Sequence, residues 1–83
     1  MKVQVRYFAS IREAIGQGTE PVQTQAATVG ALRDELIARG GAHASSLARG
    51  KAVRAALDQT MCNDAAALVD GCEVAFFPPV TGG

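Results

Sequence analysis

The sequence of 83 residues predicts one α+β domain, in which a mixed sheet of about five strands carries a long helix across one face. Residues 2–8 alternate apolar and polar side chains, as half-buried strands do, and the apolar run after the turn at residues 70–71 predicts a final strand over residues 72–77. Residues 29–39 instead repeat apolar side chains at helical spacing. Helices and strands do not strictly alternate along the chain, so an all-parallel sheet of βαβ units is not expected.

The first strand and its neighbour belong to the N-terminal part of this sheet. Polar and apolar side chains alternate from Lys2 to Tyr7, and Phe8 then falls on the polar side of the strand. Residues 20–24 predict a second strand. Pro21 favours an edge position for it, because proline cannot donate a hydrogen bond to a neighbouring strand.

A short helix is predicted between these strands, over residues 10–15. Ser10 and Glu13 have the spacing of a capping box, in which the two side chains satisfy backbone N–H groups at the start of a helix. Gly16 is a favourable stop signal, because glycine adopts the left-handed conformation that ends many helices.

The longer helix, over residues 29–39, has signals at both ends. Thr28 is a favourable N-cap residue, and Gly40 follows the last turn. Residues 40–46 are rich in glycine, alanine and serine and predict a loop. His43 is the only histidine, and we interpret it as a solvated residue of this loop because no cysteine or carboxylate lies at ligand spacing.

The second half of the chain predicts three more strands. Residues 52–57 are compatible with helix or strand, since alanines favour a helix while the apolar residues alternate. Asp58-Gln59 predicts a turn into a short strand over residues 60–62. Asp70-Gly71 is a strong turn signal before the final strand over residues 72–77.

The composition excludes several classes of protein. Eight basic and eight acidic residues give a formal net charge of zero, which argues against a general nucleic-acid binder. No apolar stretch approaches the ~20 residues of a membrane span, and the first residues lack the apolar core of a signal peptide. We therefore expect a cytoplasmic protein that does not bind membranes.

Motifs for catalysis or metal binding are absent from the sequence. There is no phosphate-binding glycine loop and no nucleophile elbow. Cys62 and Cys72 match no metal-ligand spacing, and free thiols are expected in a reducing compartment. The carboxylates are scattered, and we interpret them as solvated surface charges.

Two phenylalanines fall on the side of the sheet opposite the predicted core. Phe8 ends the first strand, and Phe77 ends the last one. Exposed apolar patches on small domains often mark a surface for a partner. An equally weighted alternative is that Phe8, Phe77 and their aromatic neighbours only straddle the edge of the core.

The C-terminal residues predict an extended segment that ends in two glycines. Pro78-Pro79 favours an extended path, and the six residues 78–83 can reach roughly 20 Å. Gly82 and Gly83 have no Cβ, so their backbone fits a slot too narrow for other residues. This pattern indicates delivery of the terminal carboxylate into another protein's active site, where it would need activation, for example as an acyl-adenylate. The alternative is a frayed terminus without a function.

Residues 74–83 closely resemble the C-terminus of the small subunits of molybdopterin synthase, which are sulfur carriers. Residues 70–74, residues 56–60 and much of residues 2–13 also resemble segments of this family, so the resemblance covers nearly the whole chain. One departure is Cys72, which replaces an acidic residue and is expected to be exposed and open to oxidation.

The resemblance implies a ubiquitin-like β-grasp domain over residues 1–77 and an extended, flexible tail over residues 78–83. In the family, an adenylating enzyme of the ubiquitin-activating type uses ATP to activate the C-terminal carboxylate, here that of Gly83. A sulfurtransferase then supplies the sulfur of a thiocarboxylate, which passes to cyclic pyranopterin monophosphate and builds the dithiolene that binds molybdenum. Gly82 and Gly83 are the expected catalytic positions. Neither a metal site nor a tightly bound cofactor is expected in this chain.

The resemblance also implies a sulfur-donating subunit of a heterotetrameric synthase whose large subunit carries the catalytic side chains. By similarity, Phe8, Met61 and Phe77 form an apolar surface shared by the large subunit and the adenylating enzyme. The tail would enter the active site of the large subunit, and its expected contact residues are Pro78, Pro79, Val80 and Thr81.

Two other functions fit the same fold. One is a carrier or modifier of another pathway, such as thiamine biosynthesis, tRNA thiolation or conjugation to proteins. The other is a β-grasp module that binds a partner without covalent chemistry. Adding one residue after Gly83 would separate them, because covalent chemistry needs the free glycine carboxylate and simple binding does not.

Overall fold

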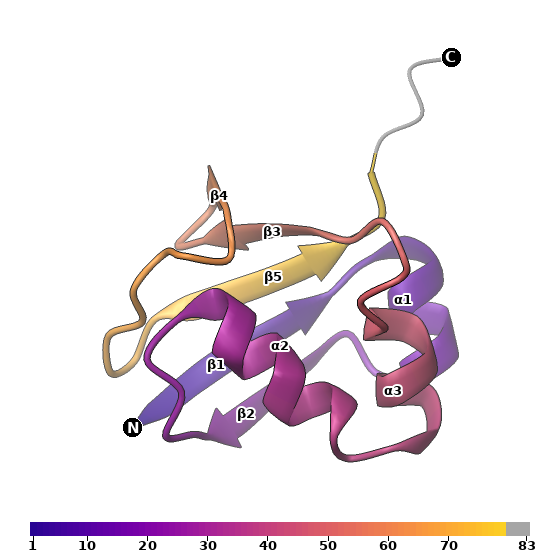
Figure 1. Cartoon of the computed structure of the whole chain (residues 1–83), viewed down its shortest axis with the longest axis horizontal. Helices are drawn as coiled ribbons and strands as arrows, with labels where there is room; N and C mark the ends of the chain where they lie inside the picture. Colours follow the sequence, from indigo (N-terminus) through magenta and orange to yellow (C-terminus); the bar gives the residue numbers. More distant parts are fainter. Residues whose placement is uncertain (80–83) are drawn as a thin grey trace.

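The computed structural model describes residues 1–79, and residues 80–83 lie outside the described part of the chain. In chain order, the elements are β1 (Lys2–Tyr7), α1 (Ala9–Ile15), β2 (Thr19–Gln23), α2 (Val29–Ile37), α3 (Gly41–Leu47), β3 (Arg54–Leu57), β4 (Thr60–Cys62) and β5 (Glu73–Phe77). The five strands form one sheet in the order β2-β1-β5-β3-β4 (Figure 1). β1 and β5 pair in parallel, and all other neighbours in the sheet pair antiparallel.

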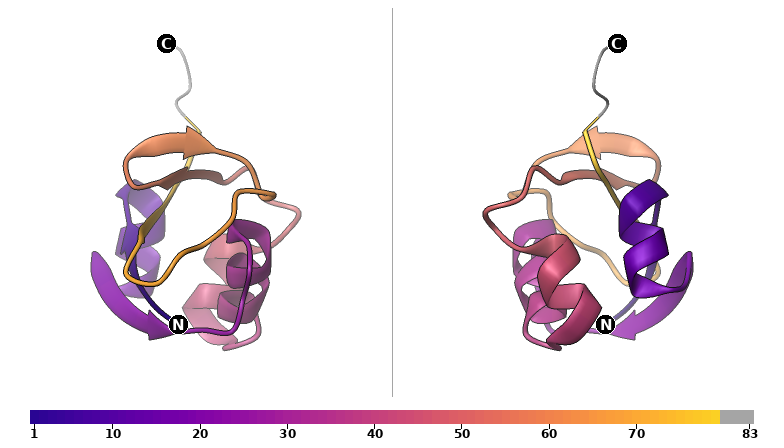
Figure 2. Two further views of the ribbon diagram at one scale, coloured as in Figure 1. Left: turned by 90° about the vertical axis from the view of Figure 1, so that its left-hand side faces the viewer. Right: turned by 90° about the vertical axis from the view of Figure 1, so that its right-hand side faces the viewer.

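This mixed sheet with helices on one side confirms the predicted α+β fold. Figure 2 shows α2 and α3 together on one side of the sheet. Val5, Val74 and Phe76 of the sheet meet Leu32 and Leu36 of α2, and each is at most 1% exposed. The prediction of one long helix is incomplete, because α2 has nine residues and α1 and α3 add seven each.

The start of α2 confirms the predicted cap. The Thr28 side chain accepts a hydrogen bond from the Ala31 backbone N–H at 3.2 Å, which satisfies one of the unpaired donors at the start of the helix. The helix ends at Ile37, two residues earlier than predicted. The N–H groups of Arg39 and Gly40 instead donate to carbonyls three residues back, in a tighter turn.

Helix α1 begins at Ala9, and the predicted capping box at Ser10 is wrong. Phe8 occupies the cap position and makes no side-chain hydrogen bond to the helix. The backbone N–H of Phe8 donates to the Phe76 carbonyl at 3.2 Å, so strand pairing continues up to the first turn and Ser10 lies inside the helix. Gly16 ends the helix with a φ of 88°, as predicted.

The segment 40–46 was predicted as a loop, and this is wrong because it contains most of helix α3. Leu47 at its end is fully buried. Arg33 of α2 donates from Nε to the Leu47 carbonyl at 2.7 Å and from Nη2 to the Ala48 carbonyl at 2.8 Å. The last carbonyls of a helix lack partners within the helix, so this side chain completes α3 from outside.

The ambiguous segment 52–57 contains strand β3, and the predicted turn after it is confirmed. Asp58 and Gln59 have φ values of 48° and 69°, as tight hairpin turns require. The Asp58 carboxylate also accepts a hydrogen bond from the Glu73 N–H at 2.9 Å, which ties the hairpin to β5. Gly71 adopts a φ of 84° in the predicted turn before β5.

The side chain of Cys72 lies in the core. Cys72 is only 4% exposed, so the expectation of an exposed thiol there is wrong. Its N–H and that of its neighbour Gly71 are held by backbone carbonyls, which turns the side chain into the core. Within residues 1–79, no helix is both long enough and apolar enough to span a bilayer. The division between a domain over residues 1–77 and a tail over residues 78–83 stays a prediction.

Candidate partner-binding surface

The open face of the sheet is the side that α2 does not cover. Val74 and Phe76 point into the core, so Ala75 and Phe77 point to the opposite side. Residues that oppose each other on paired strands share a side of the sheet, and the register therefore adds their partners to this face. The central residues of the open face are Arg6, Arg54, Ala56, Met61, Ala75 and Phe77.

Phe8 and Phe77 meet at one end of the open face. Their rings lie 6.5 Å apart between centroids with an interplanar angle of 85°, an edge-to-face arrangement that aromatic pairs favour. Phe8 is 38% exposed, whereas Tyr7 and Phe76 are each 1% exposed. The two aromatic pairs therefore divide between core and surface, and the geometry favours the exposed patch over the core-edge alternative.

Met61 extends this apolar surface onto β4. It is 57% exposed and opposes Ala56 in the β3–β4 pairing. Ala56 in turn opposes Ala75, and both alanines are small and nearly buried. Phe8, Met61 and Phe77 thus lie around the short side chains of Ala56 and Ala75. We call these three larger residues the apolar patch. That these three residues bind a partner stays a prediction.

The predicted tail leaves the sheet directly beside the apolar patch. Pro78 and Pro79 are half-buried and follow Phe77, the last residue of β5. Pro78 also borders a shallow hollow of about 310 Å³ between α1 and the segment before β3. The remaining predicted site residues, Val80, Thr81, Gly82 and Gly83, lie outside the described residues.

A partly buried polar cluster lies away from the open face, and the sequence did not reveal it. The Glu20 carboxylate accepts hydrogen bonds from the Tyr7 hydroxyl at 2.7 Å and from Arg39 Nη1 at 2.8 Å. His43 Nε2 lies 2.9 Å from the same carboxylate. The interpretations of His43 as a solvated residue and of Glu20 as a surface charge are therefore wrong. These residues are 13 to 23 positions apart in sequence, so no local pattern joins them.

The cluster fixes the charge state of Glu20. Burial alone would raise the pKa of this carboxyl, but hydrogen bonds from His43, Arg39 and Tyr7 outweigh burial and lower the pKa to about 2. Burial and the neighbouring Glu20 raise the pKa of Tyr7, so its hydroxyl remains a donor. The groups satisfy one another, and the cluster therefore joins β1, β2 and α3 without an unpaired catalytic group.

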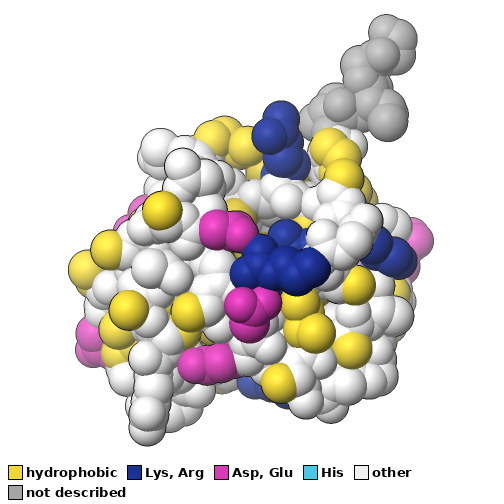
Figure 3. Space-filling model, in the orientation of Figure 1, with side chains coloured by type: hydrophobic (Ala, Val, Ile, Leu, Met, Phe, Trp, Pro, Cys, Tyr) yellow, Lys and Arg dark blue, Asp and Glu magenta, His cyan; other side chains and the backbone are white. Residues whose placement is uncertain are grey.

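A second cluster holds the N-terminal half of α2 against the loop after β4. Arg49 donates to Asp34 at 2.8 Å, to Asp64, and to the Gly30 carbonyl at 2.9 Å. Figure 3 shows the face of the molecule that carries α2, and basic and acidic side chains gather near the centre of this face. The side chains in this cluster pair with one another, which indicates a structural role.

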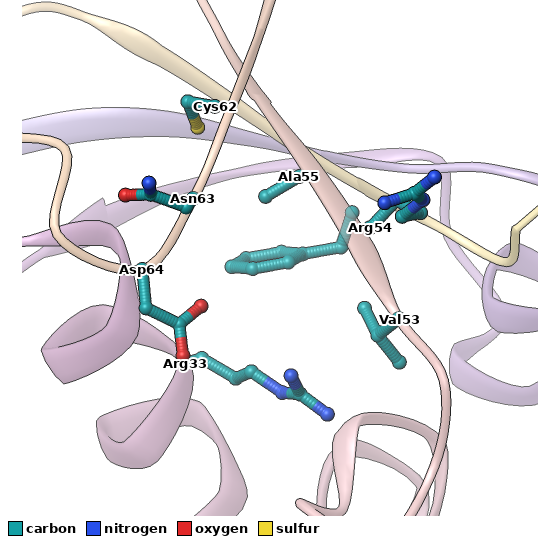
Figure 4. A pocket seen from close by; sticks show the side chains of 8 residues that line it. Arg33, Val53, Arg54, Ala55, Cys62, Asn63 and Asp64 are labelled. Carbon is teal, nitrogen blue, oxygen red and sulfur yellow. The ribbon is translucent and has the colours of Figure 1, made fainter.

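A shallow hollow of about 370 Å³ lies between this cluster and β3, and Cys62 borders it. Figure 4 shows Cys62, Asn63 and Asp64 along one side of the hollow. Burial, followed by the charge of Asp64, raises the pKa of the Cys62 thiol, which disfavours the reactive thiolate. Among residues 1–79, no group of three histidine, cysteine or acidic side chains could hold a metal ion. Within the described residues, the open face is therefore the strongest candidate site.

Comparison with known proteins agrees with this geometry. Residues 5–83 match the ThiS family. The chain belongs to this family. It is 43% identical over 81 residues to the molybdopterin synthase sulfur carrier subunit of Escherichia coli, covering 98% of this chain and 99% of that protein.

Solved structures of similar proteins extend the comparison of this ThiS-family chain. SAMP1 from Haloferax volcanii has a TM-score of 0.79 and 27% identity, with 100% of both chains covered. A complex of subunits 1 and 2 of the molybdopterin-converting factor from Helicobacter pylori contains a chain with a TM-score of 0.67 and 26% identity, again with 100% of both covered. The predicted β-grasp fold and the resemblance to sulfur carriers of molybdopterin synthase are confirmed.

Proposed function

We propose that this chain is the sulfur carrier subunit of a molybdopterin synthase, with sulfur carried on the C-terminal Gly83. The observation that supports this most directly is the apolar patch beside Pro78 and Pro79, which follow the last strand. A partner that binds the patch would receive the C-terminal residues next to it. Membership of the ThiS family and the strong similarity to named sulfur carrier subunits support the same function.

The chemistry begins with the Gly83 carboxylate, which is a poor electrophile until it is activated. Its oxygen attacks the α-phosphorus of ATP, pyrophosphate leaves, and an acyl-adenylate forms. Sulfide-level sulfur displaces AMP from the acyl carbon and leaves a thiocarboxylate; where the sulfurtransferase delivers it as a persulfide, the acyl disulfide that forms first is cleaved by a thiol, which is oxidised to a disulfide. The thiocarboxylate sulfur then forms a bond to a carbon of cyclic pyranopterin monophosphate while a carbon–oxygen bond at that carbon breaks. Water hydrolyses the resulting thioester, which leaves the sulfur on the pterin and returns the glycine carboxylate. Two carriers supply the two sulfurs of one dithiolene.

This series of reactions requires three partner proteins. An adenylating enzyme of the ubiquitin-activating type binds ATP, so this chain needs no tightly bound cofactor of its own. A sulfurtransferase supplies sulfur, and the large subunit of the synthase supplies the catalytic side chains. A compartment that holds all three and keeps thiols reduced is the cytoplasm. Gly82 would pass through the narrowest part of each active site, because only glycine lacks a Cβ.

A modifier that forms isopeptide bonds is the second candidate. The similarity to SAMP1 of Haloferax volcanii supports it, because SAMP1 stands for small archaeal modifier protein 1 and the match covers 100% of both chains. Both functions begin with the same adenylate and differ in the nucleophile that displaces AMP. Sulfur yields a thiocarboxylate, whereas a lysine amine yields an isopeptide bond. The products therefore distinguish them.

Intact-protein mass spectrometry tests the proposed function. The full chain is incubated with ATP, a cognate adenylating enzyme and a sulfur donor. We expect a mass increase equal to one oxygen replaced by sulfur, located at Gly83. The matched control carries one added residue after Gly83 and should remain unmodified with an unchanged fold. An unmodified natural chain in the presence of active enzyme would contradict the sulfur carrier, and conjugates to lysine without a thiocarboxylate would favour the modifier.

A further inference from the structure

Two arginines lie on the open face beside the apolar patch. Arg6 opposes Ala75 across the β1–β5 pairing, and Arg54 opposes Phe77 across the β3–β5 pairing. They therefore lie on the two sides of β5, two strand spacings across and two residues along the strand from each other, which places their Cα atoms about 12 Å apart. Arg54 is one of the residues that line the hollow near Cys62, and in Figure 4 its guanidinium lies on the other side of the β3 ribbon from Cys62 and Asp64.

These two arginines differ from those that stabilise the fold. Among the described residues, Arg33, Arg39 and Arg49 donate close hydrogen bonds to named partners. Arg6 Nη1 instead lies 3.7 Å from Glu73 Oε1, beyond hydrogen-bond distance, and 43% of its side chain is exposed. Arg54 is exposed and forms no ion pair with residues 1–79. The guanidinium donors of both arginines are thus available to another molecule.

The neighbouring side chains hold one of these cations in place. The Arg6 guanidinium lies 5.3 Å from the centroid of the Phe8 ring, a cation–π contact, and the Phe8 ring in turn meets Phe77. Arg6 is therefore oriented by the same aromatic pair that forms the apolar patch. A cation fixed in this way loses less conformational entropy when it binds an anion.

We propose that Arg6 and Arg54 form a cationic rim around the apolar patch, and that each pairs with a carboxylate on the large subunit of the synthase. This inference rests on the function proposed above. Guanidinium groups bind carboxylates through paired hydrogen bonds, and arginine beside aromatic residues is typical of protein interfaces. The large subunit should accordingly present an apolar centre with acidic side chains about 12 Å apart at its edge.

A protein partner fits this surface better than a nucleic acid. The two cations are isolated from each other by apolar side chains, whereas a phosphate backbone needs a continuous basic track. The formal net charge of zero also gives no general attraction to polyanions. Rim charges of this kind mainly increase the association rate and select the correct partner.

Binding kinetics with the purified large subunit test the cationic rim. Arg6→Glu and Arg54→Glu are compared with Lys2→Glu, which makes the same charge change on the same strand face, roughly 13 Å from Arg6. We expect each rim variant to raise Kd about tenfold or more at low salt, chiefly through slower association. At 1 M salt the difference should shrink to about threefold or less, because the Debye length is then ~3 Å. Lys2→Glu should change Kd by less than about twofold.

Phe77→Asp separates this inference from the proposed function. It should abolish binding of the large subunit while the fold is retained. If Phe77→Asp abolishes binding and both rim variants bind as the natural chain does, the cationic rim is overturned and the proposed function stands. If the natural chain itself does not bind the large subunit, both are overturned. Thermal unfolding of every variant checks the fold, and Arg6→Gln and Arg54→Gln replace any charge reversal that unfolds.

Discussion

Gly30 provides a sharp test of the packing between α2 and the loop after β4. A Cβ added at Gly30 would lie 2.8 Å from Asp64 Cβ and 3.2 Å from the Asp64 carbonyl oxygen. The first of these distances is shorter than real Cβ contacts allow. Because Asp64 Cβ is attached directly to the backbone, it cannot rotate away, and the loop itself must move.

The magnitude follows from three contributions to the free energy of unfolding. Alanine favours a helix over glycine by up to about 1 kcal/mol. Overpacking costs about 1–3 kcal/mol. Displacing the loop also weakens the hydrogen bond from the Gly30 N–H to the Asp64 carbonyl, now 3.0 Å, which contributes about 0.5–1.5 kcal/mol. Gly30→Ala should therefore lower the stability by about 1–3 kcal/mol, equivalent to a Tm lower by at least about 4 °C.

Urea unfolding and calorimetry measure this change, and Gly50→Ala is the matched control. A Cβ at Gly50 meets nothing within 4 Å. Alanine should therefore be neutral there, or stabilise the protein by up to about 1 kcal/mol through a less flexible unfolded chain. A Gly30→Ala protein as stable as the natural chain would refute the argument, since it would mean that the loop adjusts without cost.

Three further changes test other parts of the structure. Arg33→Leu should lower the free energy of unfolding, measured with urea, by about 2–4 kcal/mol, because it removes charged hydrogen bonds to the carbonyls of Leu47 and Ala48. It should also speed the exchange of amide hydrogens in α3. Exchange as slow as in the natural chain would argue against Arg33 as the support of that helix. The pKa of Glu20 is lowered from 4.5 to about 2, so its ionised form stabilises the fold above about pH 4.5 and this stability is lost as the pH falls toward about 2. Glu20→Gln should remove that part of the acid-unfolding curve, and an unchanged curve would show that the cluster contributes nothing. Gly82→Ala should leave thermal unfolding nearly unchanged and strongly impair sulfur transfer; normal transfer would contradict a narrow slot around the tail.

The features predicted correctly from sequence depend on neighbouring residues. The alternation in β1, the cap at Thr28 and the turn at Asp58-Gln59 are local, and each was predicted where the structure has it. The placement of Phe8 on the open face follows from the same alternation. These patterns were sufficient for the α+β fold and for the side of the sheet on which Phe8 and Phe77 lie, whereas Met61 was expected only from the family resemblance.

The features that were missed depend on distant contacts. Helix α3 has weak signals of its own and is completed by Arg33, 14 positions before Leu47. The cluster around Glu20 joins three elements, and its member His43 on α3 is 23 positions away from Glu20. Even the capping box at Ser10, which has the right local spacing, gave way to the strand pairing of Phe8. Contacts between residues that are distant in sequence override local signals at these positions, and a single sequence does not show which distant residues come into contact.

The parallel pairing of β1 with β5 has a consequence for biosynthesis. The first and last strands lie side by side at the middle of the sheet, so the ribosome completes the central strand last. A nascent chain that lacks β5 has no partner for one edge of β1 and cannot close the core. The terminal glycines follow this strand by only a few residues. Premature termination within β5 therefore removes the C-terminal glycines, on which the proposed sulfur transfer depends, together with the folded domain.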